Sequence, residues 1–125
     1  MSAAQEIADL DEALALDGED IELHRPIAGQ GPVKVTCRAF VRGASVVQLS
    51  SGVKQDASNV VLSPSEIIRR GWPGPNSSAT PTAQDRRVPR TTDKVLIAGR
   101  TRQIDAVMPV YVDGALVRID MRVLG

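Results

Sequence analysis

The end of the chain decides the fold: residues 94–125 read KVLIAGRTRQIDAVMPVYVDGALVRIDMRVLG. Three segments of this stretch are rich in aliphatic residues, namely Lys94–Ala98, Thr101–Met108 and Leu116–Leu124. In the last of them apolar and polar residues alternate, which is typical of a strand with one buried and one wet face. Asp113–Gly114 is a two-residue hairpin signal. The stretch therefore predicts three consecutive antiparallel strands.

The same pattern extends upstream. Ala98–Gly99 fits a second tight turn, between the first two of these strands. Ile21–Arg25 and Val33–Arg42 alternate apolar and polar residues, so we expect strands there, and Val60–Leu62 predicts a short one. The connection Pro26–Pro32 holds two glycines and two prolines, which favour a turn or loop.

The middle of the chain is less regular. Ser45–Val53 allows a short strand, and Lys54–Ser58 is expected to be a polar loop. In Ser63–Glu66 a serine fits the N-cap, proline the first helical position and glutamate the third, which together predict a helix start. Gly71 supplies the stop, so we expect a helix of about two turns.

The first residues predict an amphipathic helix. Ser2 and Gln5 form a capping pair, and apolar residues then recur at spacings of three and four until Asp17–Gly18. This stripe could dock on its own barrel or on a neighbouring subunit, and the pattern does not decide between them. The residues expected at a subunit or ring interface are Ile7, Leu10, Leu14 and Trp72.

These elements predict one domain, residues 1–125, of the mainly β class. We expect a small antiparallel β-barrel of about six or seven short strands with an N-terminal helix and one short internal helix, because closure removes exposed edges. Its parts are an acidic helix (1–18), the first strands and short helix (20–70), a long basic proline-rich loop (71–92) and the C-terminal strands (93–125).

Charge is unevenly distributed along the chain. Residues 1–22 carry eight acids and no Lys or Arg, although the formal net charge of the whole chain is zero. The remaining residues therefore hold a net positive charge. Fields of opposite sign suit contact with unlike partners or with the next copy of the chain. The simpler alternative is an acidic helix that is only solvated.

Residues 71–92 hold four of the eight prolines and almost no aliphatic residue, which predicts a long loop. Arginine can contact DNA phosphates without reading sequence, whereas three aromatic residues in the whole chain offer little surface for stacking single-stranded bases. The alternative is a solvated loop that pairs with acids of a partner. The candidate DNA or channel-loop residues are Arg69, Arg70, Arg86, Arg87 and Arg90.

The residues give no support to an enzyme. His24 is the only histidine and has no cysteine or carboxylate array nearby in the sequence, so we expect a rim residue and no metal site. Cys37, between Val35 and Ala39, is expected in the core. No phosphate-binding glycine motif occurs. We therefore expect no catalytic residue, no cofactor and no metal.

The chain is expected to be soluble and to lie in a reducing compartment. Its single cysteine excludes an intrachain disulfide, no apolar run exceeds four residues, and the N-terminus is acidic where a signal peptide would be basic. We expect no contact with a membrane.

The C-terminal strands resemble those of head–tail joining proteins, the head-closure, stopper or connector subunits of tailed bacteriophages and related gene transfer agents. The resemblance lies in Asp93–Arg100, Ile104–Val110, Asp113–Gly114 and Val117–Val123. It comprises an Asp that opens a strand, a glycine turn, a strand ending in Val-x-Pro and a final alternating strand. The acidic N-terminal helix, the Ser-Pro-Ser-Glu helix start and the loop at Trp72–Pro75 agree with it in kind.

The resemblance implies a structural virion protein that forms a homo-oligomeric ring, a hexamer or dodecamer, at the head–tail neck. Such a ring would meet a portal or adaptor ring on the head side and a tail-terminator or tail-tube ring on the tail side. It would close the portal channel, retain packaged double-stranded DNA and provide the tail attachment site, after assembly in the bacterial host's cytoplasm. Residues 71–92 match the channel loop by position and length.

Two other functions remain open from the sequence. One is a tail-terminator or tail-side neck subunit, which shares the ring geometry. The other, of a different class, is a small cellular barrel that binds nucleic acid through its basic loop. A hydrolase or transferase has no residue in the sequence to support it.

Overall fold

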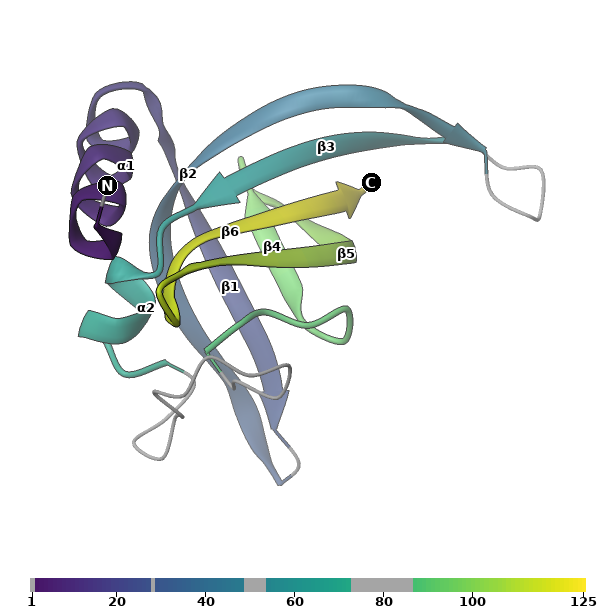
Figure 1. Ribbon diagram of the computed structural model, residues 1–125. Coiled ribbons are helices and arrows are strands. Elements are labelled where there is room, and N and C mark those ends of the chain that lie inside the picture. Colours follow the sequence, from purple (N-terminus) through teal and green to yellow (C-terminus); the bar gives the residue numbers. More distant parts are fainter. Residues whose placement is uncertain (1, 28, 49–53, 73–86) are drawn as a thin grey trace.

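The computed structural model describes residues 2–27, 29–48, 54–72 and 87–125. Six antiparallel strands form a closed barrel in the order β1-β2-β3-β6-β5-β4, and β4 pairs with β1 to close it (Figure 1). The mainly β barrel with two helices is thus confirmed. The elements are α1 (Ala3–Asp17), β1 (Glu19–Ile27), β2 (Gln30–Gln48), β3 (Lys54–Leu62), α2 (Ser65–Arg69), β4 (Lys94–Ile97), β5 (Arg100–Val112) and β6 (Ala115–Leu124).

Both tight turns of the C-terminal region are present. Ala98 and Gly99 join β4 to β5 with φ of 51° and 79°, and Asp113 and Gly114 join β5 to β6 with φ of 50° and 79°. Two successive left-handed residues match the right-handed twist of the flanking strands. The glycine at the second position of each turn adopts this conformation without strain, which explains why these two signals located the hairpins.

The strands are longer than the alternation predicted. Lys54–Ser58 was expected to be a loop, and this was wrong, because these residues begin β3, in which Lys54 pairs with Gln48 and Asp56 with Val46. The β1–β2 connection is also shorter than predicted, since β1 runs to Ile27 and β2 begins at Gln30. Pairing within a hairpin sets these limits, and it does not require an apolar face.

The far ends of β2 and β3 form a two-stranded arm that projects from the barrel on the side away from α1 (Figure 1). We call the paired residues 43–48 and 54–56 the β2–β3 arm. β3 pairs with β6 from Ala57 onward, and β2 pairs with β1 only up to Ala39. Strand pairs outside a barrel need no buried side-chain row, which is why a polar segment such as Lys54–Asp56 serves here.

The short internal helix begins later than expected. Pro64 is its N-cap, and α2 spans five residues, fewer than the predicted two turns. Pro64 already has helical φ and ψ, and the Ser63 hydroxyl oxygen accepts from the Ser65 backbone N–H at 3.2 Å, which is the type of bond that the predicted serine cap makes. Gly71 ends the turn that follows, with φ of +65°, as predicted.

The barrel interior is aliphatic. Alternate residues of each strand face it, and on β6 the inward row predicted from the sequence is buried. Cys37 belongs to this core and is 1% exposed. The members from the six strands are Ile21, Leu23, Val35, Cys37, Ala39, Val60, Leu62, Val95, Ile97, Ile104, Leu116, Ile119, Met121 and Val123.

Helix α1 lies on its own barrel, against β2 and β6. The Ser2 hydroxyl accepts from the Gln5 backbone N–H, which confirms the predicted cap. At the other end, the Arg38 guanidinium donates to the carbonyls of Leu14 and Gly18 at 3.2 and 2.6 Å. The Leu14 carbonyl also accepts from the Gly18 backbone N–H, and a cation at a helix C-terminus interacts favourably with the last carbonyls of the helix. Strand β2 thereby fixes the end of the helix.

Within the described part of the chain, no helix is both long and apolar enough to cross a membrane.

Burial makes the Cys37 thiol unreactive in the native protein. Burial, with a smaller contribution from the negative charge of Glu66, raises the pKa of Cys37 to about 12. We expect a thiol-reactive dye to leave the native protein unlabelled at pH 9 and to label it fully in denaturant, because the thiolate is the nucleophile. A Leu16→Cys variant, with a thiol at an exposed position, is the control and should label rapidly when native. Fast labelling of native wild-type protein would contradict the buried placement.

Candidate functional site

A buried ion pair lies at the open end of the seam between β1 and β4. Arg25 follows Ile21 and Leu23 on the inward row of β1, and it is 6% exposed. Its Nε donates to Asp93 Oδ1 at 3.0 Å and its Nη2 donates to Asp93 Oδ2 at 2.8 Å. Two parallel bonds of this kind are the strongest geometry for an arginine and a carboxylate. Asp93 itself is 1% exposed.

The Arg25–Asp93 pair continues the line of backbone pairing between β1 and β4 through side chains. β1 and β4 pair from Ile21 with Ile97 to His24 with Lys94, and the next positions in that register are Arg25 and Asp93. The side-chain ion pair therefore stands where the backbone pairing ends. It extends a closure seam in which β4 supplies only four residues.

The same guanidinium reaches both ends of the predicted long loop. Its Nη2 donates to the carbonyl of Val88 at 3.1 Å, and its central carbon lies 4.5 Å from the centroid of the Trp72 ring. Trp72 immediately precedes residues 73–86, which lie outside the described part of the chain, and Val88 follows them closely. The two flanks of that segment are therefore held at one point on the barrel.

The other polar groups here are also paired. Asp93 Oδ2 accepts a second bond from the Arg90 backbone N–H at 2.8 Å, and the Trp72 Nε1–H donates to the Val33 carbonyl on β2 at 3.0 Å. A buried charge pair is stable only when its remaining donors and acceptors are satisfied. We call Arg25, Trp72, Val88, Arg90 and Asp93 the Arg25 cluster.

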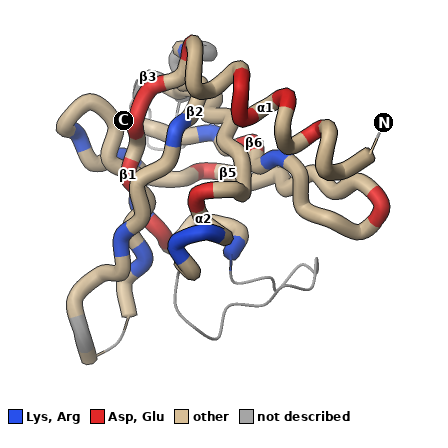
Figure 2. The backbone as a smooth tube through the Cα atoms, turned by 90° about the vertical axis from the view of Figure 1, so that its left-hand side faces the viewer, with Lys and Arg blue, Asp and Glu red and all other residues tan. Residues whose placement is uncertain are grey.

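The predicted basic residues gather near this cluster. Arg69 and Arg70 are exposed at the end of α2, where both pair with the single carboxylate of Glu66. Figure 2 shows α2 as a blue segment next to the grey trace. Arg90 is exposed and Arg87 is half-buried. Arg86 lies outside the described residues, and contact of these side chains with DNA stays a prediction.

The four expected interface residues divide into two pairs. Leu14 and Trp72 are each 2% exposed and pack inside their own subunit, which corrects the expectation for these two. Their apolar area is already covered by the barrel. Ile7 and Leu10 are half-buried on α1, and Leu10 borders a hollow between α1 and the β5–β6 hairpin. A contact between subunits through Ile7 or Leu10 stays a prediction.

The described residues bring no metal-binding set together, since no three of their His, Cys, Asp and Glu side chains converge. His24 is half-buried and its ring lies 2.5 Å from a Glu22 carboxylate oxygen two residues away on the same strand. Lys34 of β2 and Lys94 of β4 lie opposite His24 in the strand register, and neither is a metal ligand at an ordinary metal site.

Sequence reasoning missed the centre of this site. Arg25 was treated as the end of an alternating strand, although the period of two puts it on the same face as Ile21 and Leu23. A charge in the inward row of a strand is the signal that would have marked it. Its partner is 68 positions away in the sequence, so the pairing itself had no local signal.

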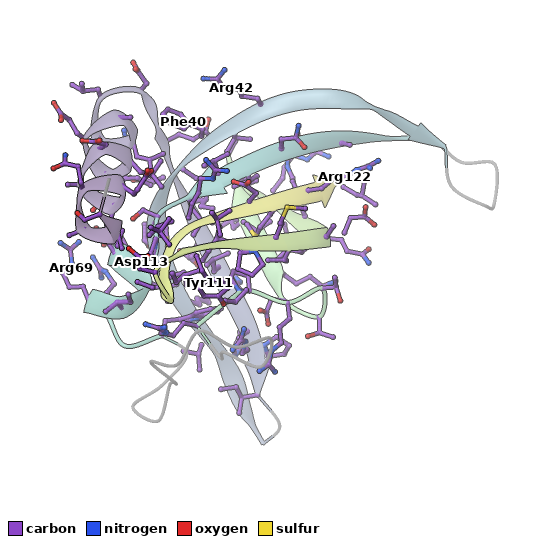
Figure 3. The ribbon with its side chains drawn as sticks, in the orientation of Figure 1. Phe40, Arg42, Arg69, Tyr111, Asp113 and Arg122 are labelled. Atoms are coloured by element: carbon purple, nitrogen blue, oxygen red, sulfur yellow. The ribbon has the colours of Figure 1, made fainter. Side chains whose placement is uncertain are left out.

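A second group of basic side chains lies elsewhere on the molecule. Figure 3 shows Arg69 on the side of α1 and α2, whereas Arg122 lies on the opposite side, on β6. Arg42, on the outer part of β2, lies over the ring of Phe40 at 5.5 Å. Positive charge is therefore present both beside the Arg25 cluster and on the outer sheet.

Breaking the Arg25–Asp93 pair is expected to destabilise the fold strongly. Arg25→Met leaves a buried carboxylate without its cation, which should lower the free energy of unfolding by about 3–5 kcal/mol. The measurement is urea unfolding followed by the fluorescence of Trp72, the only tryptophan. Arg118→Met, which breaks a half-exposed pair with Asp120, is the control and should lose at most about 1 kcal/mol. Equal losses in both variants would show that the buried pair does not hold the seam.

Comparison with known proteins finds distant similarity among solved structures. No protein-family model matches the chain, and no curated protein matches it. Among solved structures, the chain is similar to one in the virion of a native gene transfer agent particle, at 15% sequence identity and a TM-score of 0.47, over 86% of this chain and 94% of that chain. A similarity of this degree does not assign a function.

Proposed function

We propose that this chain is a structural virion subunit that forms a ring at the head–tail neck of a tailed phage or phage-like particle. The ring closes the portal channel, retains packaged DNA and provides the site for tail attachment. The observation that carries the proposal is the Arg25 cluster, which holds Trp72 and Val88, on either side of residues 73–86, at one point of the barrel. The resemblance of residues 93–123 to head-closure subunits supports it, and these residues open and form β4, β5 and β6.

The charge distribution suits a ring. Figure 2 shows acidic positions along α1 and basic positions on α2, on different parts of the molecule. Among the described residues, no Lys or Arg pairs with an acid of α1, and Arg38 bonds to carbonyls at its end and to Asp20 beyond it. Opposite fields on different faces favour head-to-tail contacts, and such contacts close into a ring when the rotation is right.

The basic segment suits retention of DNA. Arg69 and Arg70 share one acid, and Arg90 is exposed, so positive charge remains at the base of the segment. Phosphate contacts by arginine do not depend on base sequence, as a packaged genome of any sequence requires. The neighbours we propose are a portal or adaptor ring above and a tail-terminator or tail-tube ring below.

Removing the gene tests the position in the particle. We expect a deletion to give filled heads that lose their DNA and do not join tails, and complementation to restore whole particles. The measurements are electron microscopy of the particles and mass spectrometry of purified virions. Deletion particles with normal, tail-bearing necks would rule the function out. If the purified chain captures tail-tube protein but no portal-side ring, the tail-side alternative replaces the head-closure proposal.

Removing charge tests the basic segment. A triple variant with Arg86→Ala, Arg87→Ala and Arg90→Ala should assemble into particles but retain less DNA, and its salt-dependent affinity for duplex DNA should fall. The control removes three positive charges away from the segment, as Lys34→Ala, Arg42→Ala and Arg100→Ala, and should retain DNA as the wild type does. Equal retention in the two triple variants contradicts a role of the segment in holding DNA.

A further inference from the structure

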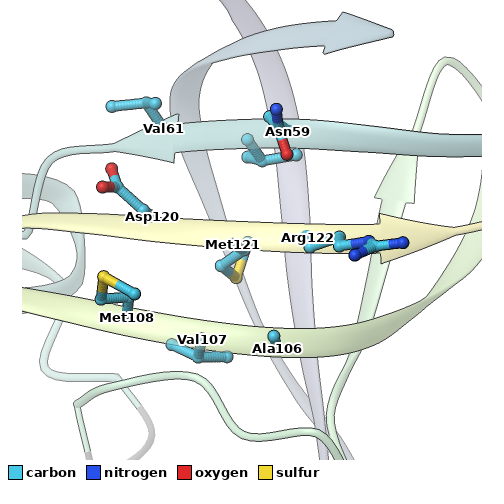
Figure 4. Close-up of a pocket in the computed structure, with 9 residues that line it drawn as sticks. Asn59, Val61, Ala106, Val107, Met108, Asp120, Met121 and Arg122 are labelled. Carbon is cyan, nitrogen blue, oxygen red and sulfur yellow. The ribbon is translucent and has the colours of Figure 1, made fainter. Parts of the chain in front are cut away.

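The outer face of β3, β6 and β5 carries a hollow of about 400 Å³ (Figure 4). The register of the three strands determines which residues form the floor of this hollow. In one row Asp120 of β6 lies between Val61 of β3 and Met108 of β5, and in the next row Arg122 lies between Asn59 and Ala106. We call these six residues the outer groove.

The outer groove combines apolar residues with one acid, Asp120, and one cation, Arg122. Met108 is 66% exposed, and Val61 and Ala106 flank the two rows. The Nε of Arg122 is buried and has no hydrogen-bond partner among the described residues, while its distance to the nearest carboxylate oxygen, on Asp105, is 3.7 Å. Asp120 forms a closer ion pair, with its Oδ1 3.1 Å from Arg118 Nε and its Oδ2 accepting from Arg118 Nη2 at 3.3 Å. A ligand with an apolar side chain beside an acid would complete this face.

The last turn of α1 has that chemistry. Leu16 is 75% exposed, whereas Leu14 is 2% exposed against the barrel. Two residues rotate a helix by about 200°, so Leu16 points away from its own subunit. Glu12 lies one turn before it on the same face and Asp17 follows it directly. Leu16 and Met108 are the two most exposed large apolar residues in the described part of the chain.

We propose that the last turn of α1 of one copy docks in the outer groove of the next copy, with Leu16 against Met108 and Val61, and an acid of the helix against Arg122. This deepens the proposed function and rests on it, because it names the two surfaces that join neighbours in the ring. Each subunit carries one of each surface on different elements. The contact is therefore head-to-tail, which is the type that forms closed rings.

Charge and burial both favour a second copy as the occupant. Glu12 and Asp17 have no ion pair among the described residues, so docking at Arg122 would give each subunit's acidic helix a cation that its own fold does not supply. Docking would also bury the exposed area of two large apolar side chains at once, and burial of apolar area stabilises such a contact.

Cysteine cross-linking tests this pairing directly. We expect a mixture of the Leu16→Cys and Met108→Cys variants to give disulfide-linked dimers under mild oxidation, and a chain with both changes to give a ladder of oligomers. Each single variant alone should give little dimer. Cys37 is a silent background, because its thiol is buried. The matched control pairs Leu16→Cys with Ile68→Cys, the third exposed apolar position, and should not cross-link.

Reversing the charges at the proposed contact provides a second test of the docking. Arg122→Glu should abolish the Leu16–Met108 cross-link, and adding Glu12→Lys and Asp17→Lys on the partner copy should restore it. Cross-links between the two Leu16→Cys positions would overturn the pairing. So would a cross-link that Arg122→Glu abolishes and the two lysine changes on the partner copy do not restore. Particles that carry the subunit in their necks but show no Leu16–Met108 cross-link would overturn the docking alone. Cross-links in a chain absent from particles would overturn the neck function and leave the docking intact.

Discussion

The buried ion pair between Arg25 and Asp93 is the constraint on which the rest of the structure depends. The barrel closes where β1 meets β4, and that seam has only four paired positions. The ion pair occupies the next position of the same register and faces the interior, so it adds a bidentate contact where the backbone ladder stops. The charge pair lies beside the backbone ladder that closes the barrel, and a neighbouring carbonyl, indole ring and backbone amide complete its surroundings.

A second arrangement separates the charges of the molecule. Arg38 anchors the end of α1 to β2, and Leu14 fastens the helix to the core, so the acidic face and Leu16 stay turned outward. The bases that could neutralise the helix lie instead on α2 and on the outer sheet. This separation is built into a single domain, so the acids of α1 and most of the bases lie on different faces of one molecule.

The sequence predicted what depends on local spacing. The α1 cap, the two glycine turns, the inward row of β6 and the core position of Cys37 all follow from patterns within a few residues. The predictions failed where a contact with a residue distant in the sequence determines the structure. Lys54–Ser58 carries too few apolar residues to predict a strand, yet residues 54–56 pair with β2 along the β2–β3 arm, and Ala57 and Ser58 pair with β6 in the barrel. Trp72 was expected at a subunit or ring interface, but contacts with Arg25 and with the Val33 carbonyl place it inside the subunit. No sequence pattern near residue 72 indicates either contact.

The joint attachment of Trp72, Val88 and Asp93 to one guanidinium has a mechanical meaning. A strand that ends in a loop is peeled from its neighbour one hydrogen bond at a time when the loop is pulled. Here tension on residues 73–86 reaches the barrel at Trp72 on one side and at residues 88–93 on the other, and both meet at Arg25. A load that enters at either flank would therefore be shared among the bonds of Arg25 before it reached the four-residue strand β4.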